Sequence, residues 1–245
     1  MGKKLLELEI ENKAADFRRK NGFSNTEPIR LKSLLLKLEV LTLFKPLSDS
    51  FSGMALKVDE NRFMMVNSQH ALGKQHFTIG HELYHLYIQE NFRSKTCKTG
   101  LFDVKDPEEY RADLFSASLL LPQEGIREFI SQSEANSITL QTILKIENYF
   151  SVSRRALLYR LKSLGYINST AYEFFTQAVK KGAVQNGYTT TLYEPGNVGE
   201  VIGEYGILAN KLYQTDKISE SHYMELMSAI GINPLEEDLD SNGKW

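Results

Sequence analysis

Features that hold secreted and membrane proteins together are scarce in this chain. Its 245 residues include one cysteine, Cys97, so no disulfide can form within the chain, which fits a reducing compartment. No segment is apolar enough to span a bilayer, and the N-terminal Met-Gly-Lys-Lys-Leu-Leu-Glu is too charged for a signal peptide. We therefore expect a cytoplasmic protein that does not insert into a membrane.

An excess of charge of either sign is also lacking. The formal net charge of -2 gives no general electrostatic attraction to nucleic acid or to a membrane surface. Hydrophobic residues make up 42% of the chain, an ordinary share for a soluble globular protein. The length suffices for one large or two small domains with a sizeable core.

The pentad from His81 to His85, with the letters HELYH, is the most informative pattern that the chain does contain. Two histidines four residues apart project from one face of a helix, where both imidazoles can bind a single Zn²⁺. Glu82 then lies beside the open position of the metal, where it can take a proton from the attacking water. The surrounding residues predict a helix that is capped by Thr78 and runs to about Asn91.

A second helix is predicted to supply the third metal ligand. Asp106 is a good N-cap and Pro107 suits the first helical position, so this helix starts here, and its apolar run ends at Pro122. A catalytic zinc needs two histidines and a carboxylate, with the fourth position left for water. We expect Glu109, in the first turn of this helix, to be that carboxylate.

Glu109 and Asp113 are one turn apart and share a face of this helix. We predict that Asp113 accepts a hydrogen bond from the free ring N–H of a ligand histidine. Glu108 is the competing ligand, but it points about 100° away from Glu109 and lacks a carboxylate partner one turn later. Glu109 also has a simpler role as a charge that complements the helix dipole, and the two roles are compatible.

These residues resemble the ImmA/IrrE-type zinc metallopeptidases of bacteria and mobile elements. That family combines a strand ending in Val-Asn, a helix with Phe-Thr-Ile-Ala-His-Glu-Leu-Gly-His, and a later helix with Glu-x-x-Ala-Asn-x-Phe-Ala that ends in Leu-Leu-Met-Pro. Here the three parts read Val66-Asn67, Phe77 to His85, and Glu109 to Pro122. The resemblance covers about residues 25–165.

Three residues depart from the family pattern. Gly80 stands where the family usually has Ala, Tyr84 where it has Gly, and Asp113 where Asn is common. A carboxylate at position 113 strengthens its predicted role as a hydrogen-bond acceptor. Tyr84 is bulkier beside the metal and could alter the cleft, so the substrate preference of relatives does not transfer.

The chain as a whole is predicted to have an α+β fold. We expect a zincin-like peptidase core, in which a small antiparallel sheet packs on the HExxH helix, followed by a helical, helix-turn-helix-like C-terminal region. Helices are predicted at 4–20 and from Pro28, strands at 40–44, 51–58 and 62–67, and a surface loop at 91–106. Residues 52–55 are the candidate sheet edge that would pair with an extended substrate.

The oxyanion donor that usually assists a zinc ion is not identified by the sequence. Candidates are His70, His76 and Tyr84, each of which also has a simpler explanation: a surface residue, a helix-entry residue and a packing residue, respectively. His222 lies far along the chain and is most simply a surface side chain.

Helices at 123–132, 138–150 and 153–164 are predicted after Pro122, and the last two have helix-turn-helix spacing. Ser153 caps the final helix, which carries Arg154, Arg155, Arg160 and Lys162. These cations could contact DNA phosphates. We favour the alternative, in which the helical pair packs against the core, because four cations in a net-negative chain are a weak footprint for DNA.

The remaining chain is predicted to be mostly helical, at 170–181, 197–213 and 218–230, the last capped by Ser219. Its polar tail from Pro234 is expected to fray. We divide the chain into a metallopeptidase domain with N-terminal helices (1–134), a helix-turn-helix-like segment (135–168) and a helical extension (169–245).

Two functions remain open at this stage. The first is a zinc endopeptidase with one Zn²⁺, and the resemblance implies a protein substrate, a helix-turn-helix repressor whose cleavage releases stress-response or mobile-element genes. The second is a non-catalytic DNA- or protein-binding regulator built on the same fold. We favour the enzyme because a scaffold has no need for a general base, Glu82, between two ligands. Zinc-dependent hydrolysis of a non-peptide amide would use the same residues.

Overall fold

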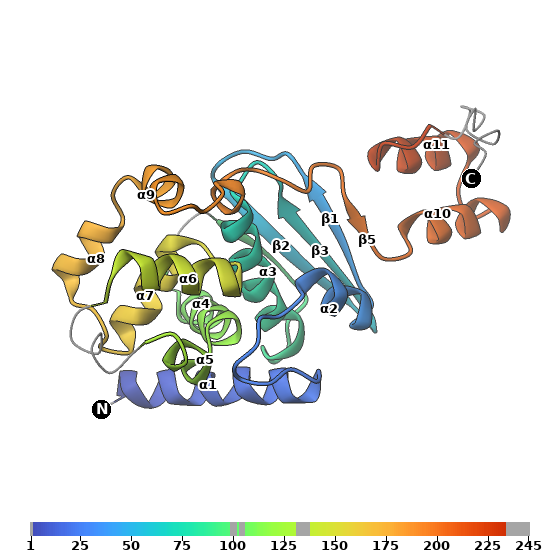
Figure 1. Cartoon of the computed structure of the whole chain (residues 1–245). Coiled ribbons are helices and arrows are strands. Elements are labelled where there is room, and N and C mark those ends of the chain that lie inside the picture. Colours follow the sequence, from blue (N-terminus) through green and yellow to red (C-terminus); the bar gives the residue numbers. More distant parts are fainter. Residues whose placement is uncertain (1, 99–101, 103–105, 131–137, 234–245) are drawn as a thin grey trace.

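The computed structural model describes residues 2–98, 102, 106–130 and 138–233 and shows an α+β fold, as predicted (Figure 1). The N-terminal half contains α1 (Gly2–Lys20), α2 (Leu31–Lys37), β1 (Val40–Lys45), β2 (Phe51–Val58), β3 (Asn61–Asn67), α3 (Leu72–Tyr87), β4 (Ser94–Lys98) and α4 (Pro107–Leu120). The C-terminal half contains α5 (Gln123–Arg127), α6 (Leu140–Phe150), α7 (Arg154–Ser163), α8 (Ser169–Phe175), α9 (Val179–Gln185), the 3₁₀ turn η2 (Thr191–Tyr193), β5 (Val201–Ile202), α10 (Tyr205–Gln214) and α11 (Glu220–Ala229).

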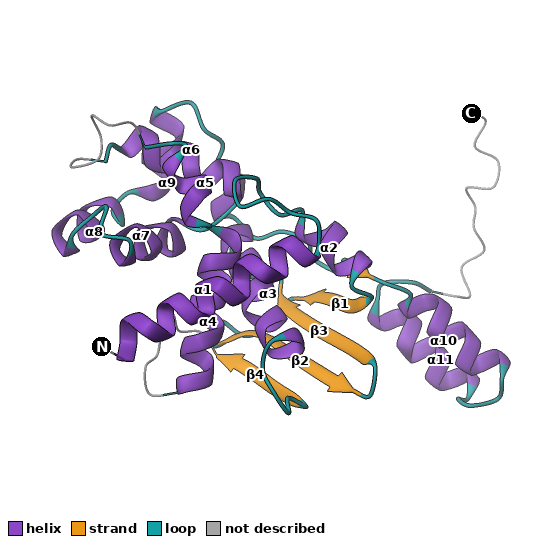
Figure 2. Cartoon of the chain, turned by 90° about the horizontal axis from the view of Figure 1, so that it is seen from below, coloured by secondary structure: helices purple, strands orange, loops and turns teal. Residues whose placement is uncertain are grey.

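The sheet has the strand order β4-β2-β3-β1-β5 and is mixed rather than purely antiparallel as predicted. β2 and β3 form an antiparallel hairpin, whereas β1 runs parallel to β3. After β1 the chain forms β2 and then turns back through the hairpin into β3. β3 therefore lies between β1 and β2, parallel to β1 and antiparallel to β2. Helix α3 packs against β2 and β3, which places the HExxH helix on one face of the sheet (Figure 2).

The predicted sheet edge is wrong. Residues 52–55 lie in β2, which pairs with β3 on one side and with β4 on the other, for example through Met54 and Thr96. The segment predicted as a loop at 91–106 therefore contains the edge strand β4, while its residues 99–101 and 103–105 lie outside the described part of the chain. The local pattern of β4 is too polar to predict a strand, and backbone pairing with β2 supplies what the pattern lacks.

Helix α3 begins seven residues earlier than predicted, at Leu72 rather than after Thr78. Thr78 is buried inside the helix, and its hydroxyl donates to the Lys74 carbonyl at 3.1 Å instead of capping the N-terminus. The start of α3 follows a loop that Asn67 holds in place. The Asn67 side chain accepts from the N–H groups of Leu47 and Gln69 and donates to three carbonyls of residues 47–51.

Helix α4 begins as predicted, with Asp106 as its N-cap and Pro107 at its first position. The Asp106 carboxylate accepts from the N–H groups of Glu108 and Glu109. Helix α4 then packs against α3 at Gly80, where a Cβ atom would lie only 2.5 Å from the Ser116 hydroxyl oxygen. The Ser116 hydroxyl donates to the Phe77 carbonyl at 2.7 Å. Glycine at position 80, a departure from the family pattern, therefore allows a very close approach of the two helices.

Helices α6 and α7 form the predicted pair, and Ser153 caps α7 by accepting from the Ala156 N–H. Two of the four cations of α7 are buried. Arg154 forms an ion pair with the fully buried Glu147 through two hydrogen bonds of 2.6 and 2.7 Å. Arg160 donates to the Leu121 carbonyl at 3.1 Å and pairs with a glutamate of α1. These contacts favour packing against the core over contact with DNA.

The helices predicted near the C-terminus are shorter than expected. The segment 170–181 is divided between α8 and α9, because Ala178 adopts a left-handed conformation with φ 47°. The segment 197–213 begins with β5, and α10 starts only at Tyr205, after Gly203 with φ 109°. Helix α5 ends at Arg127, earlier than the predicted 132.

Helix α11 matches its prediction, with Ser219 as N-cap. Helices α10 and α11 lie side by side beyond β5, away from the other helices (Figures 1 and 2). In the described part of the chain, no helix is both long and apolar enough to cross a membrane. The predicted boundary at 134/135 and the tail from Pro234 lie outside the described residues, so the domain division stays a prediction.

The buried Glu147–Arg154 pair generates a stability prediction. Replacing Glu147 by Ala leaves the Arg154 guanidinium buried without its carboxylate, and the free energy of unfolding should fall by about 3–5 kcal/mol. Denaturant titration monitored by circular dichroism measures this change. Glu173→Ala, at an exposed position of α8, is the matched control and should change stability by less than about 0.5 kcal/mol. Equal losses in both variants would contradict a structural role for the buried pair.

Candidate metal centre

Helices α3 and α4 bring together three of the residues predicted to hold a metal: His81, His85 and Glu109. The Nε2 atoms of the two histidines are 3.1 Å apart. The Glu109 carboxylate oxygens lie 3.1 Å from His81 Nε2 and 3.3 Å from His85 Nε2. Both histidines are buried, whereas the Glu109 side chain is 18% exposed, so the cluster lies at the protein surface only on the carboxylate side.

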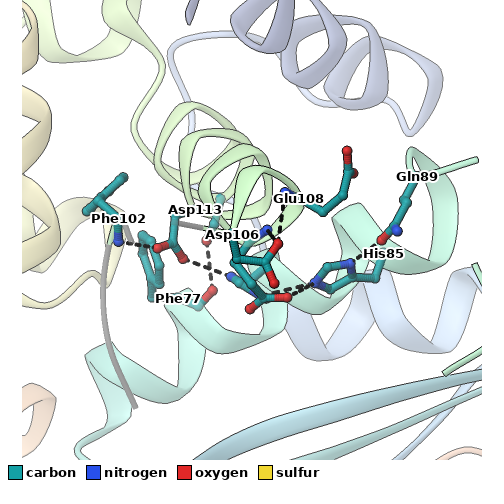
Figure 3. A network of polar contacts seen from close by, with 10 residues as sticks. Phe77, His85, Gln89, Phe102, Asp106, Glu108 and Asp113 are labelled. Carbon is teal, nitrogen blue, oxygen red and sulfur yellow. Dashed lines mark hydrogen bonds and ion pairs between the residues drawn. The ribbon is translucent and has the colours of Figure 1, made fainter. Parts of the chain in front are cut away.

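Each imidazole is oriented by a hydrogen bond at its other nitrogen, and Figure 3 shows the contact between His85 and Gln89. His81 Nδ1 is 2.8 Å from Asp113 Oδ1, and His85 Nδ1 is 2.5 Å from Gln89 Oε1. Since an amide or carboxylate oxygen can only accept here, Nδ1 of each neutral ring carries the proton and donates it. The second Asp113 oxygen accepts from the Phe102 N–H. Asp113 thus contacts His81, one of the two histidines predicted to bind the metal.

The resulting donor set fits a metal ion. With both Nδ1 atoms protonated, the Nε2 atoms present lone pairs toward each other and toward the Glu109 carboxylate, and three acceptors this close repel unless a cation lies between them. In a tetrahedral site with bonds of about 2.0–2.1 Å, ligand atoms are about 3.3–3.4 Å apart. The observed separations of 3.1–3.3 Å are close to this range and slightly shorter.

Glu82, the predicted general base, is completely buried in α3. The backbone of β2 passes directly over it, since a Cβ atom built on Gly53 would lie 3.2 Å from Glu82 Oε1 and 2.6 Å from Thr78 Cγ2. Gly53 was predicted only as part of the sheet edge 52–55, and not as a neighbour of Glu82. Its signal for this contact was a glycine inside a strand pattern, which suggests a close backbone approach.

Glu108, the competing ligand, does not join the cluster. Its carboxylate accepts from the Tyr84 hydroxyl at 2.9 Å and pairs with Arg111. Burial, together with the hydrogen bond to Glu108, raises the pKa of Tyr84. Tyr84 is 3% exposed and its hydroxyl contacts Glu108 of α4, while the effect of its bulk on the cleft stays a prediction.

The other histidines considered in the sequence lie elsewhere. His76 Nδ1 donates to the Ser151 carbonyl at 2.6 Å, and the His70 ring contacts Asp49 and Lys74. Burial lowers the pKa of both His76 and His70. His222 belongs to α11, at an exposed position. The metal cluster found among the described residues contains only His81, His85 and Glu109. Gln89, which orients His85, was missed, although it stands one helical turn after that histidine.

Comparison with protein families matches residues 36–162 to the IrrE N-terminal-like domain, a peptidase family. The match contains α3, α4 and the whole β1–β4 part of the sheet. It ends within α7, so α8 to α11 lie outside it. A search of curated proteins gave no match.

The close passage of β2 over α3 predicts a pair of variants. Gly53→Ala places a methyl group against Thr78 Cγ2 and should reduce the free energy of unfolding by about 1–3 kcal/mol. Thr78→Ser removes that methyl group but keeps the hydroxyl bonded to Lys74, so the double variant should regain part of the loss. Thermal unfolding of the two single variants and the double variant measures this coupling. Strictly additive effects would contradict the contact.

Proposed function

The chain belongs to the IrrE N-terminal-like domain family of peptidases, and from this premise we propose that it is a zinc-dependent endopeptidase acting on a protein substrate. The observation that carries the proposal is the convergence of two imidazole nitrogens and one carboxylate within 3.3 Å of one another. The buried Glu82 follows His81 directly in α3. Two nitrogen ligands and one oxygen ligand, with a further position open, are the set that hydrolytic zinc sites use. The single cysteine supports a reducing compartment such as the cytoplasm.

Each residue of the centre has a distinct role in this proposal. His81, His85 and Glu109 hold one Zn²⁺, while Asp113 and Gln89 fix the ring orientations through the Nδ1 protons. When bound, the ion supplies Lewis acidity that acidifies water and polarises the scissile carbonyl group. Glu82 accepts the proton of the attacking water on its carboxylate and then delivers it to the departing amine nitrogen.

The substrate is proposed from the family resemblance. We propose a helix-turn-helix repressor, whose cleavage would release stress-response or mobile-element genes. The alternative of a regulator that binds DNA through α7 receives less support, because Arg154 and Arg160 are engaged inside the protein. Of the four cations on that helix, only Arg155 and Lys162 lie at exposed positions, and two charges give a weak phosphate-binding surface.

Metal analysis tests the ligand assignment. Purified protein should bind one Zn²⁺ per chain, and Glu109→Ala should weaken binding by more than about 100-fold, because loss of a ligand exceeds the 10–100-fold cost of losing an outer partner. Glu108→Ala is the matched control and should stay within about tenfold of wild type. Competition with a chelator, followed by elemental analysis, measures both affinities. If Glu108→Ala loses the metal and Glu109→Ala keeps it, the ligand assignment is wrong.

Glu82→Gln tests the catalytic step. The variant should retain zinc but lose at least about 10²-fold in the rate of proteolysis, because the amide cannot accept the proton of water. The assay incubates wild type and variant with candidate helix-turn-helix repressors and with casein, and follows discrete cleavage products. Glu90→Gln, at an exposed position after α3, is the control and should cleave normally.

The outcomes of that assay separate the parts of the proposal. Unchanged turnover in Glu82→Gln would exclude this residue as the base. Cleavage of casein without cleavage of any repressor would leave the peptidase activity and remove the proposed substrate. Absence of cleavage in zinc-loaded wild type, with every substrate, would favour the non-catalytic regulator.

A further inference from the structure

The side of α3 that faces away from His81 borders a cavity. The cavity has a volume of about 350 Å³ and is bounded by the segment 28–33, by His76 and Ile79 of α3, and by the end of α6 with Ser151. This volume falls within the range of small-molecule pockets. None of the residues that line the cavity is a metal ligand or Glu82.

The geometry of α3 separates this cavity from the metal centre. His76 precedes His81 by five residues, which at 100° per residue places the two side chains about 140° apart around the helix axis. Ile79 is about 160° from His81 by the same measure. One helix therefore presents its ligands on one side and the cavity wall on the other, and the proposed peptidase reaction does not use this second side.

Most of the residues that line the cavity are apolar, and several of them are packed in the hydrophobic core. Leu31, Phe44, Ile79 and Phe150 are each less than 9% exposed to solvent, and the partly buried Ile29 packs against the same core. Four separate parts of the chain supply these side chains: α2 with its preceding loop, β1, α3 and α6. Such a wall suits the ring or chain of an apolar ligand.

The polar lining of the cavity favours an anion. Arg30, Lys32, Ser33, His76 and Asn197 contribute to it, and none of the lining residues is an aspartate or glutamate. Lys32 is already paired with Glu200 at 2.6 Å. Arg30 is exposed and forms no ion pair within the described ranges of the chain. Its guanidinium, which can bind a carboxylate through two parallel hydrogen bonds, is therefore the charge that would select a ligand.

His76 contributes an uncharged polar group. Its Nδ1 donates to the Ser151 carbonyl at 2.6 Å, and burial, with a smaller effect of Lys32, lowers the pKa of the ring. The neutral imidazole adds no second positive charge, so selection by charge falls to Arg30.

We propose that this cavity is a binding site for a small organic carboxylate with an apolar ring or chain, whose carboxylate pairs with Arg30. Such a ligand would contact the loop before α2, the back of α3 and the turn between α6 and α7 at once. It would thereby stabilise the packing of the helix that carries the metal ligands. The site does not depend on proteolysis and can be tested in protein with or without metal.

Isothermal titration calorimetry of the full chain with 2-naphthoate as the probe tests the site. We expect one molecule bound per chain with a Kd below about 1 mM, a modest affinity for a ligand of this size. Arg30→Glu should weaken binding at least about tenfold, because it replaces attraction by repulsion at an exposed position. Ser33→Trp, which places an indole at the exposed edge of the cavity, should abolish binding.

Two controls make the test specific. Arg93→Glu, an equal charge reversal at another exposed position, should bind the probe like wild type. The cation 2-naphthylmethylamine, which has the same ring system, should bind wild type at least about tenfold more weakly than 2-naphthoate. Equal affinity for both probes, equal binding by Arg30→Glu, unchanged binding by Ser33→Trp, or no binding by wild type below about 1 mM would each overturn the proposal.

Discussion

The close crossing of α3 and α4 brings His81, His85 and Glu109 together. At Gly80 the two helices approach so closely that a Cβ atom would collide with the Ser116 hydroxyl, which is hydrogen-bonded to the Phe77 carbonyl. The residue after Gly80 is the predicted ligand His81, and Asp113, one turn before Ser116, accepts a hydrogen bond from its Nδ1. Since ligand, orienting carboxylate and helix contact lie within one turn of each other, the packing of the helices and the geometry of the site are inseparable.

The ends of α4 are held by the rest of the molecule. Its N-terminus is capped by Asp106, while near its C-terminus the carbonyls of Leu119 and Leu121 accept from Arg18 of α1 and Arg160 of α7. Carbonyls in the last turn of a helix have no partner within the helix, so buried guanidinium groups satisfy them. The helix-turn-helix-like pair thus has a structural role, because Arg160 of α7 donates a hydrogen bond to the carbonyl of Leu121 at the end of α4. Helix α4 is the helix that carries Glu109.

The sequence predicted two helix starts that depend on the side chain of an N-cap residue. Asp106 and Ser153 cap their helices as expected, because an N-cap side chain bonds to N–H groups only two or three residues away. Thr78 has the same capping chemistry but lies inside α3, whose preceding turns contact distant parts of the chain, for example Gly73 with Ser153 and His76 with Ser151. Strand β4 was missed for a related reason: its partner β2 lies about 40 residues earlier in the chain, and no local pattern reports such pairing.

The sequence by itself determined which donor atoms exist and which of them share a face of one helix, because helical periodicity is a local property: His81 with His85, and Glu109 with Asp113. Only the tertiary structure decided that the two faces meet, that Glu108 turns to Tyr84 while Glu109 reaches both imidazoles, and that His76 faces a separate cavity. The distance between two helices is set by side chains far apart in the chain, such as Gly80 and Ser116, and periodicity carries no information about that distance.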